Sequence, residues 1–274
     1  MAVDQWWRSQ ASPLLMGIVN VTPDSFSDGG RFFSHDAAIR HGLALIGQGA
    51  AIIDVGGESS RPGASPISQD EEIERIIPVI EAVVKSGARV SVDTYKPQVM
   101  QAAARAGASL VNDIYALRQP GALEMAADLK IPVCLMHMQG TPENMQVNPS
   151  YDDVIGDIRR FLENRIDACL SAGIDSDRIF VDPGFGFGKT RAHNLALMKG
   201  IGAFSGLGAG LVVGLSRKAF VRNISGANEG AALDEASAML GALAAERGAR
   251  VLRVHEVKRT AEILNLWRQV SATR

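Results

Sequence analysis

The sequence predicts a single (β/α)8 barrel, also called a TIM barrel, and three observations lead to this prediction. Short apolar runs rich in β-branched residues alternate with longer amphipathic stretches along almost the whole chain, a pattern typical of parallel sheets covered by helices. Eight such strand–helix units follow one another. The 274 residues show no linker or second composition regime. We therefore expect one domain over residues 1–274, with residues 1–13 as an N-terminal extension.

The expected strands are short apolar runs, most of which end in a polar residue. They cover residues 14–20, 50–56, 89–93, 109–113, 132–137, 179–183, 211–216 and 251–255. In a barrel of parallel strands all carboxyl ends lie on one rim, where active sites of this architecture are found.

The expected helices are the amphipathic stretches between these runs. They cover residues 36–49, 71–87, 97–107, 122–129, 151–173, 193–200, 234–248 and 257–270. Several end in glycine, which is common at helix C-termini. Pro78 lies inside the second helix, where we expect it to cause a kink.

Composition excludes several classes of function. Hydrophobic residues make up 46% and charged residues 21%, as in soluble globular proteins. A net charge of −2 without a Lys/Arg-rich block argues against nucleic-acid binding, and there is no apolar run long enough for a membrane span. The start lacks the apolar core of a secretory signal. Cys134 and Cys169 form neither a disulfide framework nor a metal-ligand pair. We expect a cytoplasmic enzyme.

The stretch VDPGFGFGKT, residues 181–190, is similar to a phosphate-binding P-loop but does not match it. The P-loop pattern requires a glycine five positions before Gly188, and Pro183 stands there instead. Proline has no backbone N–H to offer a phosphate. A P-loop ATPase therefore remains only a third alternative.

Two long connections follow the first two expected strands. Residues 21–34 and 59–69 are rich in turn-forming residues, and loops of this length are usually functional. Both follow strands, so both belong to the rim that carries the site.

Polar side chains stand at or just after the carboxyl ends of all eight expected strands. They are Asn20, Asp54, Glu58, Asp93, Asn112, Asp113, His137, Asp182, Ser216, Lys218, Arg253 and His255. At any single position ordinary turn chemistry explains an Asp or Asn equally well. Convergence of the whole set on one rim favours a functional site.

The first part of this set is suited to bind a flat nitrogen heterocycle. Asp93, Asn112 and Asp182 are short acceptors and donors, and buried carboxylates must find donors such as adjacent amino and ring N–H groups. Lys218 is a further donor. Met136 and Phe187 are expected to cover the ring faces, although ordinary core packing is the alternative for both residues.

The second part of this set is suited to bind an anion. Arg253 and His255 are two residues apart in a strand and therefore point to the same side. They close the eighth strand, near which barrel enzymes often bind phosphate. Arg61, in the loop after the second strand, is a third cation for the same centre.

Taken together, the motifs resemble the dihydropteroate synthase family. The matching segments are MGIVNVTPDSFSDGG, DVGGESSRPGA, SVDTYKP, VNDI, LMHMQGTP, DPGFGFGKT, GLSRKAF and RVHEV, in family order over residues 14–257. Two departures are conservative. Ser60 stands where threonine is common, and Tyr95 where a smaller residue is often seen.

The resemblance implies a reaction between 6-hydroxymethyl-7,8-dihydropterin pyrophosphate and 4-aminobenzoate that gives 7,8-dihydropteroate and pyrophosphate. It implies Mg²⁺ as cofactor, with Asn20 as its protein ligand, and a homodimer. Asp93, Lys218, Arg253 and His255 would be catalytic. The pterin site would comprise Asp93, Asn112, Met136, Asp182, Phe187 and Lys218, and the pyrophosphate site Asn20, Arg61, Arg253 and His255. The 4-aminobenzoate pocket would comprise Phe26, Ser60, Arg61, Pro62 and Ser216.

No covalent nucleophile is expected, because pyrophosphate leaves readily once its charge is neutralised. The alternatives are a pterin-binding barrel that transfers a methyl group from methyltetrahydrofolate to a corrinoid protein, and a non-catalytic pterin- or anion-binding protein. The first would not need the Arg253 and His255 anion site.

Overall fold

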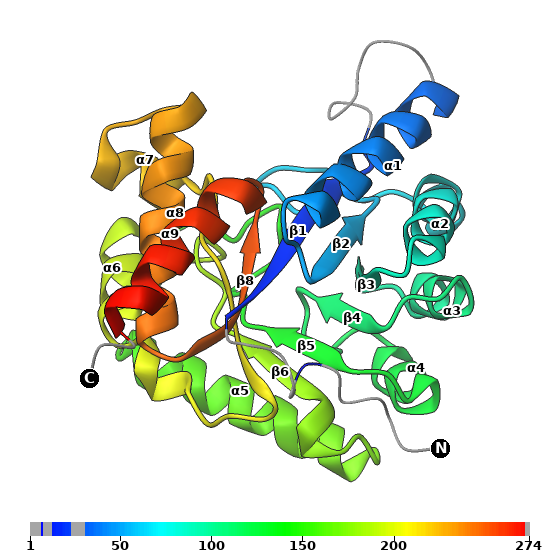
Figure 1. Cartoon of the computed structure of the whole chain (residues 1–274). Coiled ribbons are helices and arrows are strands. Elements are labelled where there is room, and N and C mark those ends of the chain that lie inside the picture. The colour runs from blue at the N-terminus through cyan, green and yellow to red at the C-terminus, as the bar shows by residue number, and fades with distance from the viewer. Residues whose placement is uncertain (1–6, 8–12, 23–30, 272–274) are drawn as a thin grey trace.

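The structure, a computed structural model, describes residue 7 and residues 13–22 and 31–271. Eight parallel strands close a barrel in chain order, and β1 pairs with both β2 and β8 (Figure 1). They are β1 Leu14–Asn20, β2 Ile52–Gly56, β3 Arg89–Asp93, β4 Leu110–Asp113, β5 Val133–Met136, β6 Ile179–Asp182, β7 Gly210–Gly214 and β8 Ala249–Val254. The predicted (β/α)8 barrel is confirmed.

Helices surround the barrel, as Figure 1 shows. They are α1 Arg31–Gly47, α2 Gln69–Lys85, α3 Pro97–Arg105, α4 Ala122–Leu129, α5 Val154–Ser171, α6 Arg191–Lys199, α7 Ala219–Ser225, α8 Gly230–Glu246 and α9 Val257–Ser271, with short 3-10 turns at Ser176–Arg178 and Ile201–Phe204. α2 continues as one helix past Pro78. α7 is not among the predicted helices, because its seven residues are too few to show a helical period.

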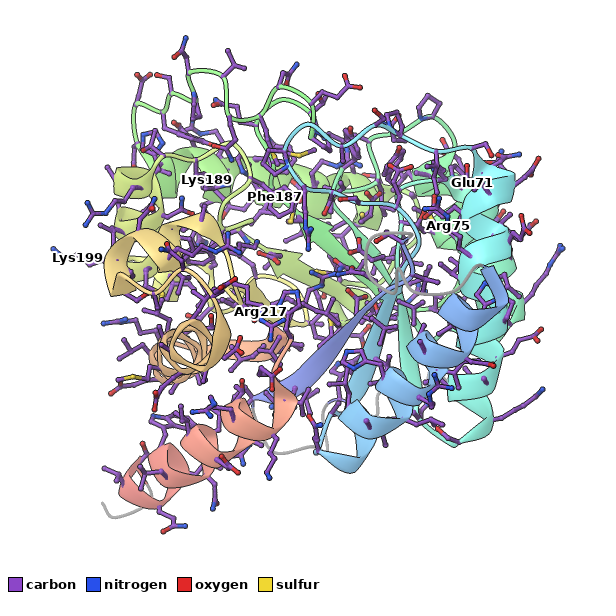
Figure 2. The ribbon with its side chains drawn as sticks, turned by 90° about the horizontal axis from the view of Figure 1, so that it is seen from above. Glu71, Arg75, Phe187, Lys189, Lys199 and Arg217 are labelled. Atoms are coloured by element: carbon purple, nitrogen blue, oxygen red, sulfur yellow. The ribbon has the colours of Figure 1, made fainter. Side chains whose placement is uncertain are left out.

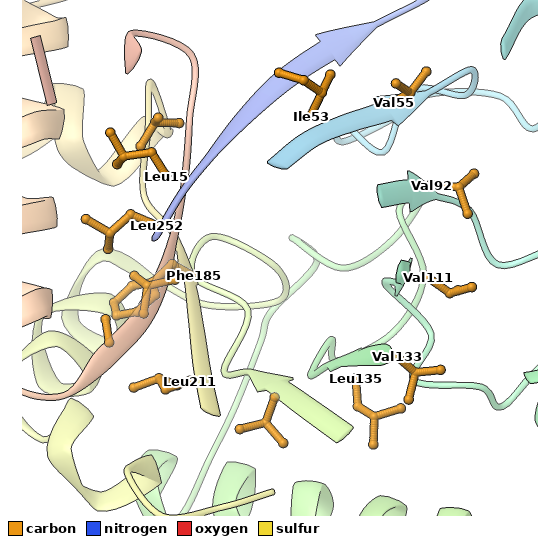
Figure 3. Packing of buried hydrophobic residues seen from close by; sticks show 14 of the residues in the cluster. Leu15, Ile53, Val55, Val92, Val111, Val133, Leu135, Phe185, Leu211 and Leu252 are labelled. Carbon is orange, nitrogen blue, oxygen red and sulfur yellow. The ribbon is translucent and has the colours of Figure 1, made fainter. Parts of the chain in front are cut away.

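Alternation along the strands separates two apolar layers. One set of side chains packs between the sheet and the helices, as Figure 3 shows for Leu15, Ile53 and Leu252 among others. The neighbours of these residues, such as Leu14, Ile52 and Val251, form a separate cluster inside the barrel. Successive side chains of a strand point to opposite faces, so the short apolar runs are buried on both sides.

Trp7 completes the inner cluster at the amino-terminal end of the barrel. Its side chain is buried and meets Phe180 of β6 edge to face, with ring centroids 5.6 Å apart. Its carbonyl accepts a hydrogen bond from Arg250 of β8. The predicted N-terminal extension therefore supplies a core residue.

The inner face of the barrel changes character toward the carboxyl ends of the strands. Two positions beyond the apolar residues Ile52, Leu110, Phe180 and Val251 stand Asp54, Asn112, Asp182 and Arg253. Positions i and i+2 of a strand share a face. The same alternation that fills the core therefore places these polar groups inside the barrel mouth.

Two further predictions concern the chain as a whole. No helix in the described part of the chain is long and apolar enough to cross a membrane. Cys134 and Cys169 are both buried free thiols.

Candidate active site

Arg253 lies at the centre of the polar cluster in the barrel mouth. Its Nε donates to Oδ2 of Asp54, and its Nη2 donates to Oδ2 of Asp93, each at 2.6 Å. Asn112 donates from Nδ2 to the same Asp54 oxygen at 3.2 Å. Four strands thus join one hydrogen-bonded network, and the three predicted residues Asp93, Asn112 and Arg253 belong to it.

Asp54 is in the predicted set of polar residues at the strand ends, but no substrate site was assigned to it. Its side chain is fully buried, and it holds both Arg253 and Asn112. Asp54 lies two positions after Ile52 on β2, so both side chains point into the barrel. This alternation is enough to assign Asp54 to the site.

The charges of this network stabilise one another. Burial lowers the pKa of Arg253, but the Asp54 and Asp93 carboxylates outweigh that effect, so the guanidinium stays protonated. Burial raises the pKa of Asp93 above its usual range, and the Arg253 guanidinium opposes that rise. Because an unpaired charge is costly here, removal of any one partner disturbs the others.

Asp182 and Lys218 form a second part of the same site. Asp182 is buried at the end of β6 and accepts the backbone N–H of Gly184 at 2.7 Å. The Lys218 ammonium lies over the Phe187 ring, 4.5 Å from its centroid, and donates to the Phe185 carbonyl. Burial lowers the pKa of Lys218 to about 8, with Asp182 acting in the opposite direction. The structure therefore brings these three predicted pterin contacts together.

The turn after β6 places Phe187 over this cluster, and Figure 2 labels Phe187 and Lys189 within it. Gly184 has a φ of +69°, and a Cβ there would lie 1.9 Å from the His137 carbonyl oxygen, so only glycine fits. Phe187 joins the partly buried rim of an apolar cluster that contains Met136 and Met138. This cluster forms an apolar wall beside the Lys218 ammonium.

Lys189 stabilises that turn by hydrogen bonds to its backbone. Its ammonium donates to the Gly184 and Phe187 carbonyls, each at 2.9 Å, and lies 3.0 Å from Nδ1 of His137. Burial lowers the pKa of His137 to about 2, so its ring is neutral and accepts the third hydrogen bond. Because all three N–H groups of Lys189 are occupied, the lysine of the GKT segment holds the loop together.

His255 follows Arg253 at the edge of the mouth. Its backbone N–H and its Nδ1 lie 3.2 and 2.9 Å from the Ser216 hydroxyl. Burial lowers the pKa of His255 to about 3, and Arg217, Arg253 and Arg61 add to that effect. The ring is therefore neutral at pH 7 and offers hydrogen bonding rather than charge.

Comparisons with known proteins identify the family of this chain. The family model described as pterin binding enzyme matches residues 16–255. The dihydropteroate synthase of Escherichia coli K12 is 46% identical over 255 residues, which cover 93% of this chain and 90% of that protein. The chain belongs to the dihydropteroate synthase family of pterin-binding enzymes. It is therefore a transferase, as the sequence predicted.

Solved structures of dihydropteroate synthases are also similar to this chain. One from Xanthomonas albilineans with 4-aminobenzoic acid has a TM-score of 0.89 and 48% identity, over 96% of this chain and 94% of that one. A complex of the same organism's enzyme with 7,8-dihydropteroate has a TM-score of 0.86 and 46% identity, over 96% and 95% of the two chains. A Yersinia pestis enzyme with a sulfonamide drug has a TM-score of 0.89 and 44% identity, over 95% of each.

The remaining predicted residues of the dihydropteroate synthase site lie around the mouth. Asn20 ends β1 and is partly exposed, Ser60 is partly exposed, and Arg61 and Pro62 are exposed in the loop after β2. Arg61 is near enough to His255 to lower its pKa. Phe26 lies outside the described residues. The assignment of these residues to substrate and metal stays a prediction.

Two polar residues from the ends of strands do not belong to the cluster. Asp113 has the outward parity on β4, and its carboxylate accepts the backbone N–H groups of Tyr115 and Leu117 at 2.7 and 2.8 Å. His137 lies under the turn after β6, as described above. For these two residues the turn interpretation holds, and strand parity distinguishes them from Asn112 and Met136.

Arg217 is a further residue that the sequence did not indicate, and Figure 2 labels it beside α8. Its φ is +58°, a conformation that costs energy in a residue other than glycine. Its guanidinium makes two hydrogen bonds to Asp234, at 2.7 and 3.1 Å, and one to Glu256 at 3.0 Å, and its backbone N–H donates to Ser237 at 3.1 Å. These contacts fix the backbone between Ser216 and Lys218.

Proposed function

We propose that this chain joins 6-hydroxymethyl-7,8-dihydropterin pyrophosphate to 4-aminobenzoate, giving 7,8-dihydropteroate and pyrophosphate as a step of folate biosynthesis. The observation that carries the proposal is the buried network of Asp54, Asp93 and Arg253 beside Asp182 and Lys218. Similar enzymes have been solved with 4-aminobenzoic acid and with 7,8-dihydropteroate.

The pterin fits the inner part of the mouth. Asp182 and Asn112 offer acceptors and donors for its amino and ring N–H groups, and Lys218 donates to its carbonyl or ring nitrogen. Met136 and Phe187 cover the ring. Burial raises the pKa of Asp182, so the carboxylate gains most from a ligand that supplies paired N–H donors.

The pyrophosphate fits the outer part of the mouth. A guanidinium carries five N–H groups, and Asp54 and Asp93 each use one of those on Arg253. The others are available to phosphate oxygens, with Arg61 adding charge and neutral His255 donating a hydrogen bond. Arg253 thus lies between the pterin side and the leaving group.

The donor set is compatible with a magnesium ion that arrives with its substrate. No three His, Cys, Asp or Glu side chains within the described ranges are arranged to hold a metal. Mg²⁺ bound to a phosphorylated substrate needs only one or two protein ligands, and the amide oxygen of Asn20 at the end of β1 is a suitable one. When bound, Mg²⁺ would neutralise charge on the pyrophosphate.

Catalysis then needs no covalent intermediate on the protein. As the pterin C–O bond breaks, Arg253 and His255 stabilise the departing pyrophosphate, and Asp93 stabilises the positive charge that spreads over the pterin ring. The amine of 4-aminobenzoate attacks the exocyclic carbon and loses a proton. Ser60, Arg61, Pro62 and Ser216, with Phe26, would line its pocket and exclude water, which otherwise captures the cation.

An assay with each substrate omitted in turn tests this function. Formation of 7,8-dihydropteroate and pyrophosphate only when both substrates are present is the expected result. Release of pyrophosphate without 4-aminobenzoate would indicate a hydrolase. Methyl transfer from methyltetrahydrofolate to a corrinoid protein would instead support the alternative barrel enzyme.

We also propose a cytoplasmic homodimer that assembles through α8 and α9. These helices are neighbours, and each exposes two apolar residues one turn apart. Met239 and Leu243 on α8 are 58% and 40% exposed, and Leu266 and Val270 on α9 are 64% and 71% exposed. Exposed apolar patches of this kind favour association. Analytical ultracentrifugation of the wild type and Met239→Glu checks this, since the variant should sediment as a monomer.

A further inference from the structure

The loop after β2 is closed at its base by a compact set of hydrogen bonds. Oε2 of Glu58 accepts the backbone N–H of Ile67 at 2.9 Å, so the two ends of the segment 59–66 are held together. The Arg75 guanidinium on α2 donates to the Gly57 carbonyl at 2.8 Å and pairs with Glu71, and Figure 2 labels Arg75 and Glu71 on that helix. The position of the segment is therefore set from its base.

Lys96, just after β3, ties this base to the barrel. Its ammonium donates to Oε2 of Glu58 at 2.6 Å, to the Ile67 carbonyl at 2.7 Å and to Oε2 of Glu72 at 2.7 Å. All three of its N–H groups are used. The side chains of Lys96, Glu58 and Glu72 are 13%, 12% and 1% exposed, so these contacts are well shielded from water.

Tyr95 links the same base to the wall of the pterin site. Its hydroxyl donates to Oε1 of Glu58 at 2.7 Å. Its ring packs edge to face on Tyr115, with centroids 4.8 Å apart, and joins the apolar cluster that contains Met136 and Phe187. Tyr95 thus contacts the wall with its ring and the loop with its hydroxyl.

The tip of the segment, around Gly63, has fewer contacts than its base. The Gly63 N–H donates to the Pro142 carbonyl at 3.2 Å, in the loop after β5. The side chains of Arg61 and Pro62 are exposed. The placement of Arg61 over the site therefore depends on the base of the loop.

We propose that Tyr95 and Lys96 are positioning residues for the second substrate. They hold the 59–66 segment at a fixed distance from the pterin wall, so that the arylamine pocket exists before the arylamine enters. This role rests on the proposed function, because it assigns the segment to the 4-aminobenzoate side. It predicts that loosening the base impairs arylamine use and leaves pterin use nearly intact.

Tyr95→Phe is the sharpest test, since it removes one hydroxyl and keeps the ring packing. A hydrogen bond to a charged group changes an equilibrium by roughly tenfold. We expect the KM for 4-aminobenzoate to rise by about that factor, the KM for the pterin pyrophosphate to change less than about twofold, and kcat to fall only slightly.

Three further variants define the pattern. Tyr151→Phe removes a hydroxyl that donates to the Gly188 carbonyl at 2.7 Å, in the turn that carries Phe187, so it should affect the pterin KM instead. Lys96→Met should exceed the effect of Tyr95→Phe, and Lys85→Met, at an exposed position of α2, should have none. Parallel rises of both KM values in Tyr95→Phe, or no change in either, would overturn the proposal.

Hydrogen exchange gives a readout that does not depend on turnover. The amides of residues 59–67 should exchange faster in Tyr95→Phe than in the wild type, while those of β2 and β3 stay protected. Unchanged exchange would also overturn the proposal. If the wild type makes no dihydropteroate, the proposed function fails. The exchange experiment still decides whether Tyr95 and Lys96 hold the 59–66 segment.

Discussion

The two ends of the barrel are built from the same strands and the same inward-facing positions, yet their interiors differ completely. At the amino-terminal end Trp7, Phe180 and Cys134 pack in a buried apolar cluster. At the carboxyl end Asp54 and Arg253 stand two positions further along the strands. One end contributes the free energy of apolar burial, and the other holds charges whose burial costs free energy.

The barrel therefore separates the residues that stabilise the fold from those of the candidate active site along its own axis. A dry, well-packed end keeps the strands in register. That register fixes where the charged side chains lie at the other end, so they are preorganised for a ligand without a large reorganisation. Four changes test this contrast, and the first should have the largest effect.

Replacement of Arg253 by Met should abolish most activity. It removes the cation that holds Asp54 and Asp93, and we expect kcat/KM to fall by roughly 1000-fold. Binding of the pterin pyrophosphate should suffer more than binding of a pterin without phosphate, as measured by calorimetry. Equal losses for both ligands would contradict the pyrophosphate role.

The matched control lies on the same strand. Arg250, at the amino-terminal end of β8, donates to the Trp7 carbonyl. Arg250→Met should lower the melting temperature slightly and leave kcat/KM unchanged, since this arginine is remote from the mouth.

Replacement of Trp7 by Ala should mainly affect stability. Removal of a fully buried aromatic side chain costs about 3–5 kcal/mol of unfolding free energy. Urea unfolding measures this change, and activity per folded molecule should stay near that of the wild type. Trp7→Phe should recover much of the loss. A large fall in kcat at low temperature in the alanine variant would show that the two ends are not separate.

Replacement of Asp182 by Asn should affect binding without loss of stability. Pterin affinity should fall by roughly 100-fold, because the ligand loses a charge-assisted pair of hydrogen bonds. The unfolding free energy should be unchanged or higher, since burial raises the pKa of Asp182 and an amide oxygen still accepts from Gly184. Near-normal affinity by calorimetry would remove Asp182 from the pterin site.

The smallest effect should come from pH acting on Lys218. Burial lowers its pKa to about 8, so the ammonium loses its proton above that pH and kcat/KM should fall by about tenfold per pH unit. Because the pKa in the folded state is below the usual 10.5, the charged lysine lowers the free energy of unfolding at pH values below 8. This loss of stability disappears as the pH rises from 8 to 10.5. In Lys218→Arg the alkaline fall should disappear. Its persistence would assign the fall to another group.

Much of the fold followed from the sequence because buried parallel strands leave a strong signal. The runs 14–20 and 89–93 are the full strands β1 and β3, and the helix 122–129 is α4. α1 begins five residues before the expected 36–49, because its first turn contains no amphipathic pattern. α7 has no signal of its own, because its seven residues are too few to show a helical period.

The candidate site followed less completely. Asp93, Asn112, Asp182 and Arg253 meet as expected because the carboxyl ends of all eight parallel strands lie on one rim of the closed barrel. The alternation of side chains along β2 also identifies Asp54 as an inward-facing residue of the site. Arg217, by contrast, acts through Asp234 on α8, seventeen residues later, and no local pattern in the sequence reports such a contact.

The Arg253 hydrogen bonds also determine when during folding the site can exist. They join β8 to Asp54 and Asp93 across 199 and 160 residues of chain. A ribosome-bound chain that has not yet released its last strand therefore lacks the network of Arg253, Asp54 and Asp93, however well its earlier strands are paired. Any ligand that binds only the closed site therefore stabilises the folded chain as a whole by mass action.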